Sequence, residues 1–548
     1  MGSHIFHGRR MNDRFETDSD THDRDSDSDR DRDIATILQY LIRSGQVRII
    51  AATSPLLYDE ESDDELCHNR TPPKIDRHPD TSRLKGSDLS QVIKLNSGAL
   101  NDRPANSTSG MNPLLSMLRC REVGMNGRLC FSQGDRCQIT QRVLPNKKDM
   151  LDRYHGKVFC GTFARDGDVF MSAAQDYCIR LYDTSNGRFK LKRTIEARDV
   201  GWSILDTVVS PDGSNFIYCS WSECIHICNV FGDQEVHEAL PLFPEERRFC
   251  VFALRFSQDG REILGGANDE CLYVYNREEN KRTLKIRSHE DDVNTVAFAD
   301  NTSQILFSGG DDGICKVWDR RTLCEAQPKP VGILVGHEDG ITYVDSKGDG
   351  RHLITNSKDQ TIKLWDMRAF SPPSSIEGSR RAVASHNWDY RWQRVPSSLN
   401  KHKRKLPGDT SLMTYRGHSV LQTLIRCHFS PEATTGQSYI YTGCAQGRVV
   451  VYDVLTGKIK SILSGHSGCV RDVSWHPYRN EIMSSSWDGT VFKWTYNKTE
   501  IDSDSEELSN VYTQVRENDV SGSSGLRRSQ RLADQQRKRQ ELEMLDAC

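Results

Sequence analysis

Short runs of alternating apolar and small or polar residues recur along the chain between about residues 155 and 495. Each run, such as "FMSAAQDYCIRLYD" or "LITNSKDQTIKLWD", predicts two β-strands joined by a tight turn, because alternation is the period of a half-buried strand. The pattern therefore predicts a repeated, all-β unit. The seven runs end at Asp183, Asn229, Asn276, Asp319, Asp366, Asp453 and Thr495.

The spacing of these runs indicates the architecture. Their ends are separated by 46, 47, 43, 47, 87 and 42 residues, and a period of about 40–45 residues is that of WD repeats, each a four-stranded propeller blade. We therefore predict an all-β, seven-bladed WD-repeat β-propeller over residues 131–495. The 87-residue step has room for an eighth blade. The polar sequence in this step has no strand–turn–strand run, so we interpret residues 369–413 as an insertion between blades 5 and 6.

Three of the repeats share four positions. A His precedes the first strand, a Ser or Thr lies on the second strand, an Asp lies in the tight turn and a Trp lies on the third strand. These sets resemble WD repeats, in which the four groups form a chain of hydrogen bonds that fixes the loops of a blade. Repeats 2 and 3 lack parts of the set. The predicted structural residues are His289, Ser308, Asp312 and Trp318; His337, Thr355, Asp359 and Trp365; and His466, Ser484, Asp488 and Trp494.

The last repeat lacks a fourth strand of its own, because the sequence after Thr495 is rich in acidic residues ("IDSDSEELS"). Propellers usually close by taking a strand from before the first repeat. The alternating stretch "RCQITQRVL", residues 136–144, is our candidate for that strand.

Three further segments lie outside the repeats. Residues 1–33 are dominated by Asp, Arg and Ser and are expected to be disordered, because they bury too little apolar area to offset chain entropy. Residues 34–130 are predicted to form a helical extension and linker. Residues 496–548 are predicted to be a disordered or helical basic tail.

Charge and hydropathy narrow the class of partner. The chain has 73 Lys and Arg against 77 Asp and Glu, so direct binding of nucleic acid or of an anionic membrane is not expected. No apolar run is long enough to span a bilayer and no signal peptide is recognisable, which favours nucleus and cytoplasm. "KHKRK" (401–405) and "RKR" (537–539) are either nuclear localisation signals or ordinary solvated charge.

Motifs for catalysis or cofactor binding are absent from the sequence, which has no GxxxxGK[ST] loop, no HExxH and no CxxC. Cys224, His226 and Cys228 alternate along one strand and could suit zinc. We favour packing instead, because small thiols pack well in a buried strand. The prediction is a non-catalytic chain with no metal and no cofactor.

An arginine follows the Trp-Asp pair at the same place in repeats 4 and 5. Arg321 follows Asp319 and Arg368 follows Asp366, each in the turn between the third and fourth strands. These turns lie on one rim of a propeller, so the two arginines are expected to emerge from neighbouring blades. Arg is favoured at interface hot spots, and the pair predicts a two-pronged binding site.

The two stretches "SGGDDGICKVWDRR" and "TNSKDQTIKLWDMR" resemble the WDxR boxes of substrate receptors for cullin-4 ubiquitin ligases. That resemblance implies binding to the adaptor called damaged-DNA-binding protein one, and through it to cullin 4 with its RING subunit. It assigns adaptor contacts to Asp319, Arg321, Asp366 and Arg368. The chain would then present a protein substrate for ubiquitination without catalysing a step itself.

The stretch "PLLSMLRCREVG" predicts a helix, in which Pro113 suits the first turn and Gly124 the position after the end. It is similar to the helix by which such receptors enter a pocket of the adaptor. Leu114, Leu115 and Leu118 would then contact the adaptor. Alternatively, the helix packs on the rim of its own propeller.

The insertion is the predicted place of substrate contact. It contains "HNWDYRW", whose Trp388, Tyr390, Arg391 and Trp392 are residue types enriched at hot spots, and we expect it on the face opposite the arginines. Alternatively, its aromatic residues pack on blade 5 or 6. A competing hypothesis for the whole chain is a non-catalytic scaffold of a nuclear complex, for example in RNA processing, and an enzyme ranks last.

Overall fold

The computed structural model describes residues 75–99, 113–124, 130–232, 234–245, 248–386, 388–399 and 405–498. The predicted head (1–33), residues 401–404 of the basic cluster at 401–405, the cluster at 537–539 and all of the tail after Lys498 lie outside the described residues.

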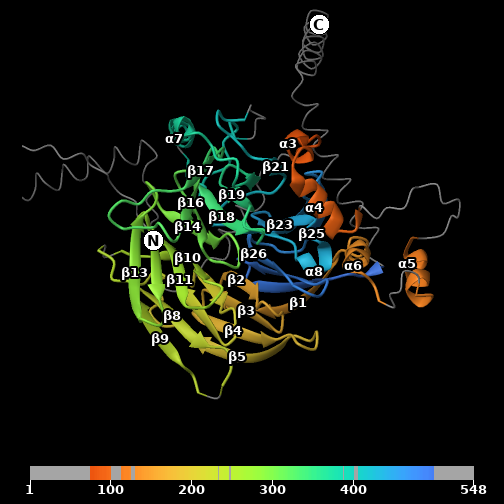
Figure 1. Ribbon diagram of the computed structural model, residues 1–548. Coiled ribbons are helices and arrows are strands. Elements are labelled where there is room, and N and C mark those ends of the chain that lie inside the picture. The colour runs from red at the N-terminus through yellow and green to blue at the C-terminus, as the bar shows by residue number, and fades with distance from the viewer. Residues whose placement is uncertain are drawn as a thin grey trace, which may run out of the picture. The chain divides into compact units, whose positions relative to one another are not determined.

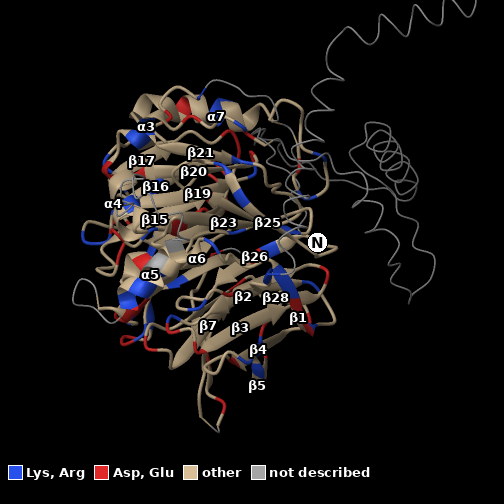
Figure 2. Ribbon diagram, turned by 90° about the vertical axis from the view of Figure 1, so that its right-hand side faces the viewer, with Lys and Arg blue, Asp and Glu red and all other residues tan. Residues whose placement is uncertain are grey.

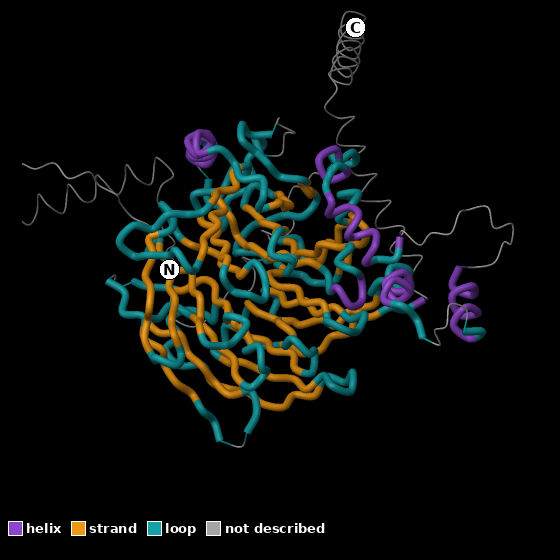
Figure 3. Tube along the Cα trace, viewed as in Figure 1, coloured by secondary structure: helices purple, strands orange, loops and turns teal. Residues whose placement is uncertain are grey.

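Strands dominate the described chain, and they form seven four-stranded antiparallel sheets around a common centre (Figures 1 and 3). The inner strands of neighbouring sheets pack on one another, as β14 packs on β10 and on β18. The fold is therefore a seven-bladed β-propeller, as the repeat spacing predicted. No described helix is long and apolar enough to cross a bilayer.

Each blade runs from an inner strand beside the channel to an outer strand. Blades 1 to 3 are β2 (Val158–Phe163), β3 (Val169–Ala174), β4 (Cys178–Asp183) and β5 (Lys190–Glu196); β6 (Asp206–Val209), β7 (Asn215–Cys219), β8 (Cys224–Asn229) and β9 (His237–Pro241); and β10 (Val251–Phe256), β11 (Glu262–Ala267), β12 (Cys271–Asn276) and β13 (Lys281–Arg287). Blades 4 and 5 are β14 (Val293–Phe298), β15 (Ile305–Gly310), β16 (Ile314–Asp319) and β17 (Gly332–Val335); and β18 (Ile341–Ser346), β19 (His352–Ser357), β20 (Thr361–Asp366) and β21 (Met413–Arg416). Blades 6 and 7 are β22 (Cys427–Phe429), β23 (Tyr439–Cys444), β24 (Arg448–Asp453) and β25 (Ile459–Ser464); and β26 (Val470–Trp475), β27 (Ile482–Ser486), β28 (Thr490–Thr495) and β1 (Lys147–Arg153).

The propeller closes with a strand from before the first repeat, as predicted, but the predicted segment is wrong. The closing strand is β1, whose Lys147 pairs with Thr495 of β28. Residues 136–144 instead begin inside a helix, α6 (Gln133–Thr140). Ser132 Oγ accepts a hydrogen bond from the Asp135 amide, and the Asp135 carboxylate accepts one from the Ser132 amide. This capping box starts a helix where the short alternating pattern suggested a strand.

The insertion is also placed differently from the prediction. β20 and β21 are neighbours in one sheet, with Leu364 opposite Met413. The predicted insertion, residues 369–413, therefore does not lie between blades 5 and 6, and residues 367–412 separate the third and fourth strands of blade 5. A long loop between paired strands is tolerated because the entropy cost of closing it grows slowly with length. The insertion contains a 3-10 turn (Pro373–Ser375) and helix α7 (Ile376–Ala384).

The predicted hydrogen-bond chain is present in blades 4, 5 and 7. In blade 5, His337 joins Asp359 through Nδ1 (2.9 Å) and Thr355 through Nε2 (2.6 Å), and Trp365 Nε1 donates to Thr355 Oγ1 (2.8 Å). His289, Ser308, Asp312 and Trp318 repeat this arrangement in blade 4, and His466, Ser484, Asp488 and Trp494 repeat it in blade 7.

Short helices from before the propeller complete its core at blades 5 and 6. They are α3 (Ser82–Lys85), α4 (Asp88–Asn96) and α6, which packs beside α8 (Glu432–Thr435) of blade 6. Leu89 and Ile93 of α4 are buried in one cluster with Met413 and Tyr452. This part of the predicted extension, residues 75–99, therefore belongs to the propeller's own core.

Candidate functional site

Arg321 and Arg368 lie in equivalent turns of adjacent blades. Arg321 follows β16 of blade 4 and Arg368 follows β20 of blade 5, and the inner strands of these blades pack together. The edge of the propeller that carries these two turns is called the arginine rim. Both side chains are exposed, Arg321 by 68% and Arg368 by 60%.

Arg321 is braced by the aspartate of its own Trp-Asp pair. Its Nε and Nη2 donate to the two carboxylate oxygens of Asp319 at 2.9 and 2.6 Å, and its amide donates to Oδ1 at 3.0 Å. These hydrogen bonds from Arg321 lower the pKa of Asp319 to about 2. The fork-to-fork pairing orients the guanidinium while leaving its outer edge open to solvent.

Arg368 has different partners, which the repeat pattern did not predict. The Nε and Nη2 of Arg351 donate to Oδ2 of Asp366 at 3.0 and 2.6 Å. The Nε of Arg368 lies 3.6 Å from Oδ1 of the same carboxylate. The Nη2 of Arg368 instead lies 3.3 Å from the carboxylate of Asp88, at the start of α4. No local sequence signal links Asp88 to an arginine 280 residues away.

The helix predicted at "PLLSMLRCREVG" is present as α5 (Pro113–Glu122). Pro113 is its first residue, as predicted, and Gly124 follows its end with φ +67°, a left-handed conformation that glycine adopts without a steric cost. Leu115 and Leu118 are exposed by 55% and 37%. The helix thus offers apolar side chains at its surface, while Leu114 is half-buried.

Comparison with known proteins places these features in a family. A model described as "WD domain, G-beta repeat" matches residues 280–319, 328–366 and 457–495, which are the repeats with complete hydrogen-bond chains. The chain is 43% identical to the LEC14B protein of Lithospermum erythrorhizon over 70% of its own length and 82% of that protein. It is 39% identical to the DDB1- and CUL4-associated factor 11 homolog of Caenorhabditis elegans over 80% of its length and 79% of that protein. The chain belongs to the DDB1- and CUL4-associated factor 11 family.

In this member of the factor 11 family, the insertion of blade 5 crosses to the edge opposite the arginine rim. Trp388 Nε1 donates to Asp339 at 2.8 Å, just before β18. The Tyr390 ring lies 4.4 Å from Lys358 Nζ, in the turn that precedes β20. Because Arg368 follows the other end of β20, the side chains of Trp388 and Tyr390 lie at the far end of the blade. This edge is called the opposite rim.

The four predicted substrate residues therefore have different surroundings. Trp388 and Tyr390 anchor the insertion to its own blade, and the Tyr390 carbonyl also accepts a hydrogen bond from the Gln422 amide at 2.9 Å. Arg391 pairs with Asp389 at 2.7 Å, and Trp392 is exposed by 77%. Packing thus accounts for the first two aromatic residues, and a role of all four in substrate binding stays a prediction.

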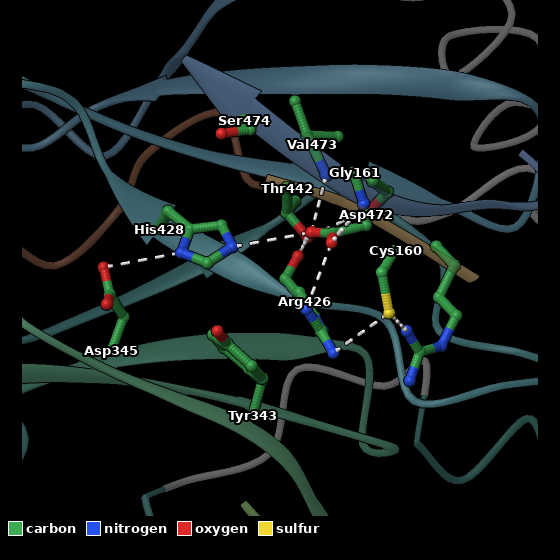
Figure 4. A network of polar contacts seen from close by, with 12 residues as sticks. Cys160, Gly161, Tyr343, Asp345, Arg426, His428, Thr442, Asp472, Val473 and Ser474 are labelled. Carbon is green, nitrogen blue, oxygen red and sulfur yellow. Dashed lines mark hydrogen bonds and ion pairs between the residues drawn. The ribbon is translucent and has the colours of Figure 1, made fainter. Parts of the chain in front are cut away.

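Buried charges that the repeat pattern did not reveal bridge the centre of the factor 11 propeller. Arg426, before β22, pairs with Asp206 of β6 at 2.6 Å and with Asp472 of β26 at 3.1 Å. His428 lies between Asp472 and Asp345, at 3.7 and 3.8 Å (Figure 4). Burial would raise the pKa of Asp472, but Arg426 and His428 lower it to about 2. The network joins blades across the channel and has the character of a structural brace.

The Cys-His-Cys stretch of β8 is packed. His226 stacks on Tyr218 with ring centroids 5.0 Å apart, and Cys228 is buried. Burial lowers the pKa of His226 to about 4, which keeps its ring neutral near pH 7. Within the described residues, no group of three or more His, Cys, Asp or Glu side chains is arranged to hold a metal ion.

Proposed function

We propose that the chain is the substrate-recognition subunit of a cullin-4 RING E3 ubiquitin ligase. In this role it binds the adaptor DDB1 through the arginine rim and presents a protein substrate, while the transfer of ubiquitin is catalysed by other subunits. The proposal rests on kinship with two nematode proteins named as DDB1- and CUL4-associated factor 11 homologs.

The arginine rim supports the proposal physically. Two guanidinium groups in matched turns, that of Arg321 oriented by Asp319 and that of Arg368 by Asp88, form a preorganised pair of donors for acidic or carbonyl groups of a partner. Basic and acidic side chains are otherwise interspersed over the chain (Figure 2). The pair is therefore a local recognition feature within a surface of mixed charge.

The test is affinity purification of the tagged full-length chain, scored for DDB1 and cullin 4. Arg321→Ala combined with Arg368→Ala should weaken recovery of DDB1 by about a hundredfold or more, because each hot-spot arginine is worth about 2 kcal/mol on truncation. Arg261→Ala is the matched control, since Arg261 is also exposed, by 63%, and lies in the turn after β10, on the same rim of blade 3. Failure of the wild-type chain to recover DDB1 would favour the scaffold hypothesis instead.

A further inference from the structure

The channel mouth on the opposite rim is divided into an aromatic part and an acidic part. The turns after the second strands lie on this rim, and three of their residues reach toward the next blade. Trp487 of blade 7 lies 5.5 Å from Phe159 of β2, and Trp221 of blade 2 lies 6.5 Å from Phe252 of β10 (ring centroids). In blade 4 the equivalent residue is Asp311, which binds Lys358 of blade 5 at 2.7 Å.

Three aromatic rings on this rim already hold a cation from the chain itself. Lys157 lies over Trp487 at 4.6 Å, Arg471 over Phe159 at 5.2 Å and Lys358 over Tyr390 at 4.4 Å. Trp221 and Phe252 are half-buried, and within the described chain no Lys or Arg lies over either ring. This edge-to-face pair is therefore an open place for a cation–π contact.

Asp292 lies in blade 4, next to the blade that carries Phe252. It immediately precedes β14, whose neighbour toward blade 3 is β10, the strand that carries Phe252. Burial, and after it the Cys219 thiol, raises the pKa of Cys250, which lies just before β10. The nearby Asp292 carboxylate raises the pKa of this thiol further. Among the described residues, no hydrogen bond or ion pair reaches the Asp292 carboxylate.

The charge of Asp292 is poorly compensated. Burial, and after it the carboxylates of Asp311 and Asp291, raises its pKa to about 8, and Lys358 and Arg391 oppose this only in part. The lysine is already bound to Asp311, and the arginine to Asp389. A further cation beside Asp292 would satisfy a carboxylate that the described part of the chain leaves without a partner.

We propose that this mouth binds a basic segment of a protein partner, with one Lys or Arg side chain between the Trp221–Phe252 pair and the Asp292 carboxylate. The brace of Arg426, Asp206 and Asp472 spans the channel, so a side chain enters and a chain does not thread through. The carboxylates of this part repel phosphate, which disfavours nucleic acid and anionic lipid. The inference rests on the proposed function in one respect, namely that the partner is the substrate.

The experiment measures fluorescence anisotropy of fluorescein-labelled Gly-Ser peptides with spaced Arg, Gln or Glu residues, mixed with the full-length chain at pH 8.5. The Arg peptide should bind best. Asp292→Asn should weaken its binding by about tenfold, the size expected when one charge-assisted contact is lost. Phe252→Leu, which keeps an apolar side chain, should weaken binding of the Arg peptide by about threefold and leave binding of the Gln peptide unchanged.

Glu270→Gln is the matched control, because Glu270 lies on the same rim and its carboxylate already pairs with Arg287 at 2.6 Å. It should leave binding within about twofold of the wild type. Melting curves of all variants establish that they are folded. Equal binding of the three peptides, best binding of the Glu peptide, or equal losses in Asp292→Asn and Glu270→Gln would overturn the proposal.

A second readout is the pH dependence of binding. A cation favours the charged carboxylate, so binding below pH 8 must release the proton held by Asp292. The affinity of the Arg peptide should therefore rise between about pH 7 and pH 9 in the wild type and stay flat in Asp292→Asn. Recovery of DDB1 is measured on the same variants and should not change, so a failure of this inference is distinct from a failure of the proposed function.

Discussion

Asp359→Ala tests the hydrogen-bond chain of blade 5 most directly. The buried Asp359 carboxylate accepts from His337 Nδ1 at 2.9 Å, from the Glu338 amide at 3.1 Å, and from the amide and hydroxyl of Thr361 at 3.0 and 2.7 Å. Hydrogen bonds to a charged group are worth about 1.5–3 kcal/mol each, but four that share one carboxylate are not additive. We expect a loss of about 3–5 kcal/mol in the free energy of unfolding, the range for breaking a buried charged pair.

Asp312→Ala in blade 4 is the matched comparison. Within the described residues, Asp312 accepts from only His289 and the Ile314 amide, with Lys316 at 3.8 Å, so its removal leaves fewer donors without a partner. Its loss should be about half that of Asp359→Ala. Urea denaturation gives the free energies, and hydrogen exchange of blade amides locates the change. Equal losses in the two variants, or unchanged stability of Asp359→Ala, would refute the reasoning.

Three other predictions concern the core, the helix α5 and acid stability. Leu89→Ala, in the helix packed on blades 5 and 6, should lower the free energy of unfolding by about 2–4 kcal/mol in the same denaturation assay. Leu118→Asp should reduce recovery of DDB1 while leaving the melting temperature unchanged, because Leu118 is exposed; a large fall in melting temperature would show that α5 belongs to the core. The pKa values of Asp359 and Asp488 are held well below their usual range, since the paired His side chains outweigh burial. The stabilisation that these two carboxylates contribute is present above about pH 4 and is lost as the pH falls further. The free energy of unfolding of Asp359→Ala should therefore fall less steeply in acid than that of the wild type.

The fold was predictable because its signals are local and repeated. Each hydrogen-bond chain joins residues about 20 positions apart, and the strand alternation is read within one run, so the sequence alone specifies the blades. The closing strand was missed because β1 is a charged strand at the edge of its sheet, with "KKDMLDR" half-exposed, and carries no apolar alternation. The insertion was misplaced because β21 is only a four-residue strand at the end of a long polar segment.

The arginines of the candidate site were predictable for the same reason, whereas their surroundings were not. The pairing of Asp88 with Arg368 spans 280 residues, and that of Arg426 with Asp206 spans 220. Such contacts depend on how blades and helices meet in space, and no periodic signal records them. Likewise, Asp292 is one of several acidic residues in the sequence, and only the fold shows that it immediately precedes the strand that packs on β10.

Blade 5 connects the two rims through a single strand. β20 runs from the turn that holds Lys358, beside the channel mouth, to the turn that holds Arg368. Six residues at about 3.3 Å each span about 20 Å, so the two proposed binding sites lie at opposite ends of this strand. Asp359 binds Thr361 at the start of this strand, and Trp365 near its end closes the same hydrogen-bond chain. The chain that stabilises blade 5 therefore also fixes the distance between the proposed adaptor site and the proposed substrate site.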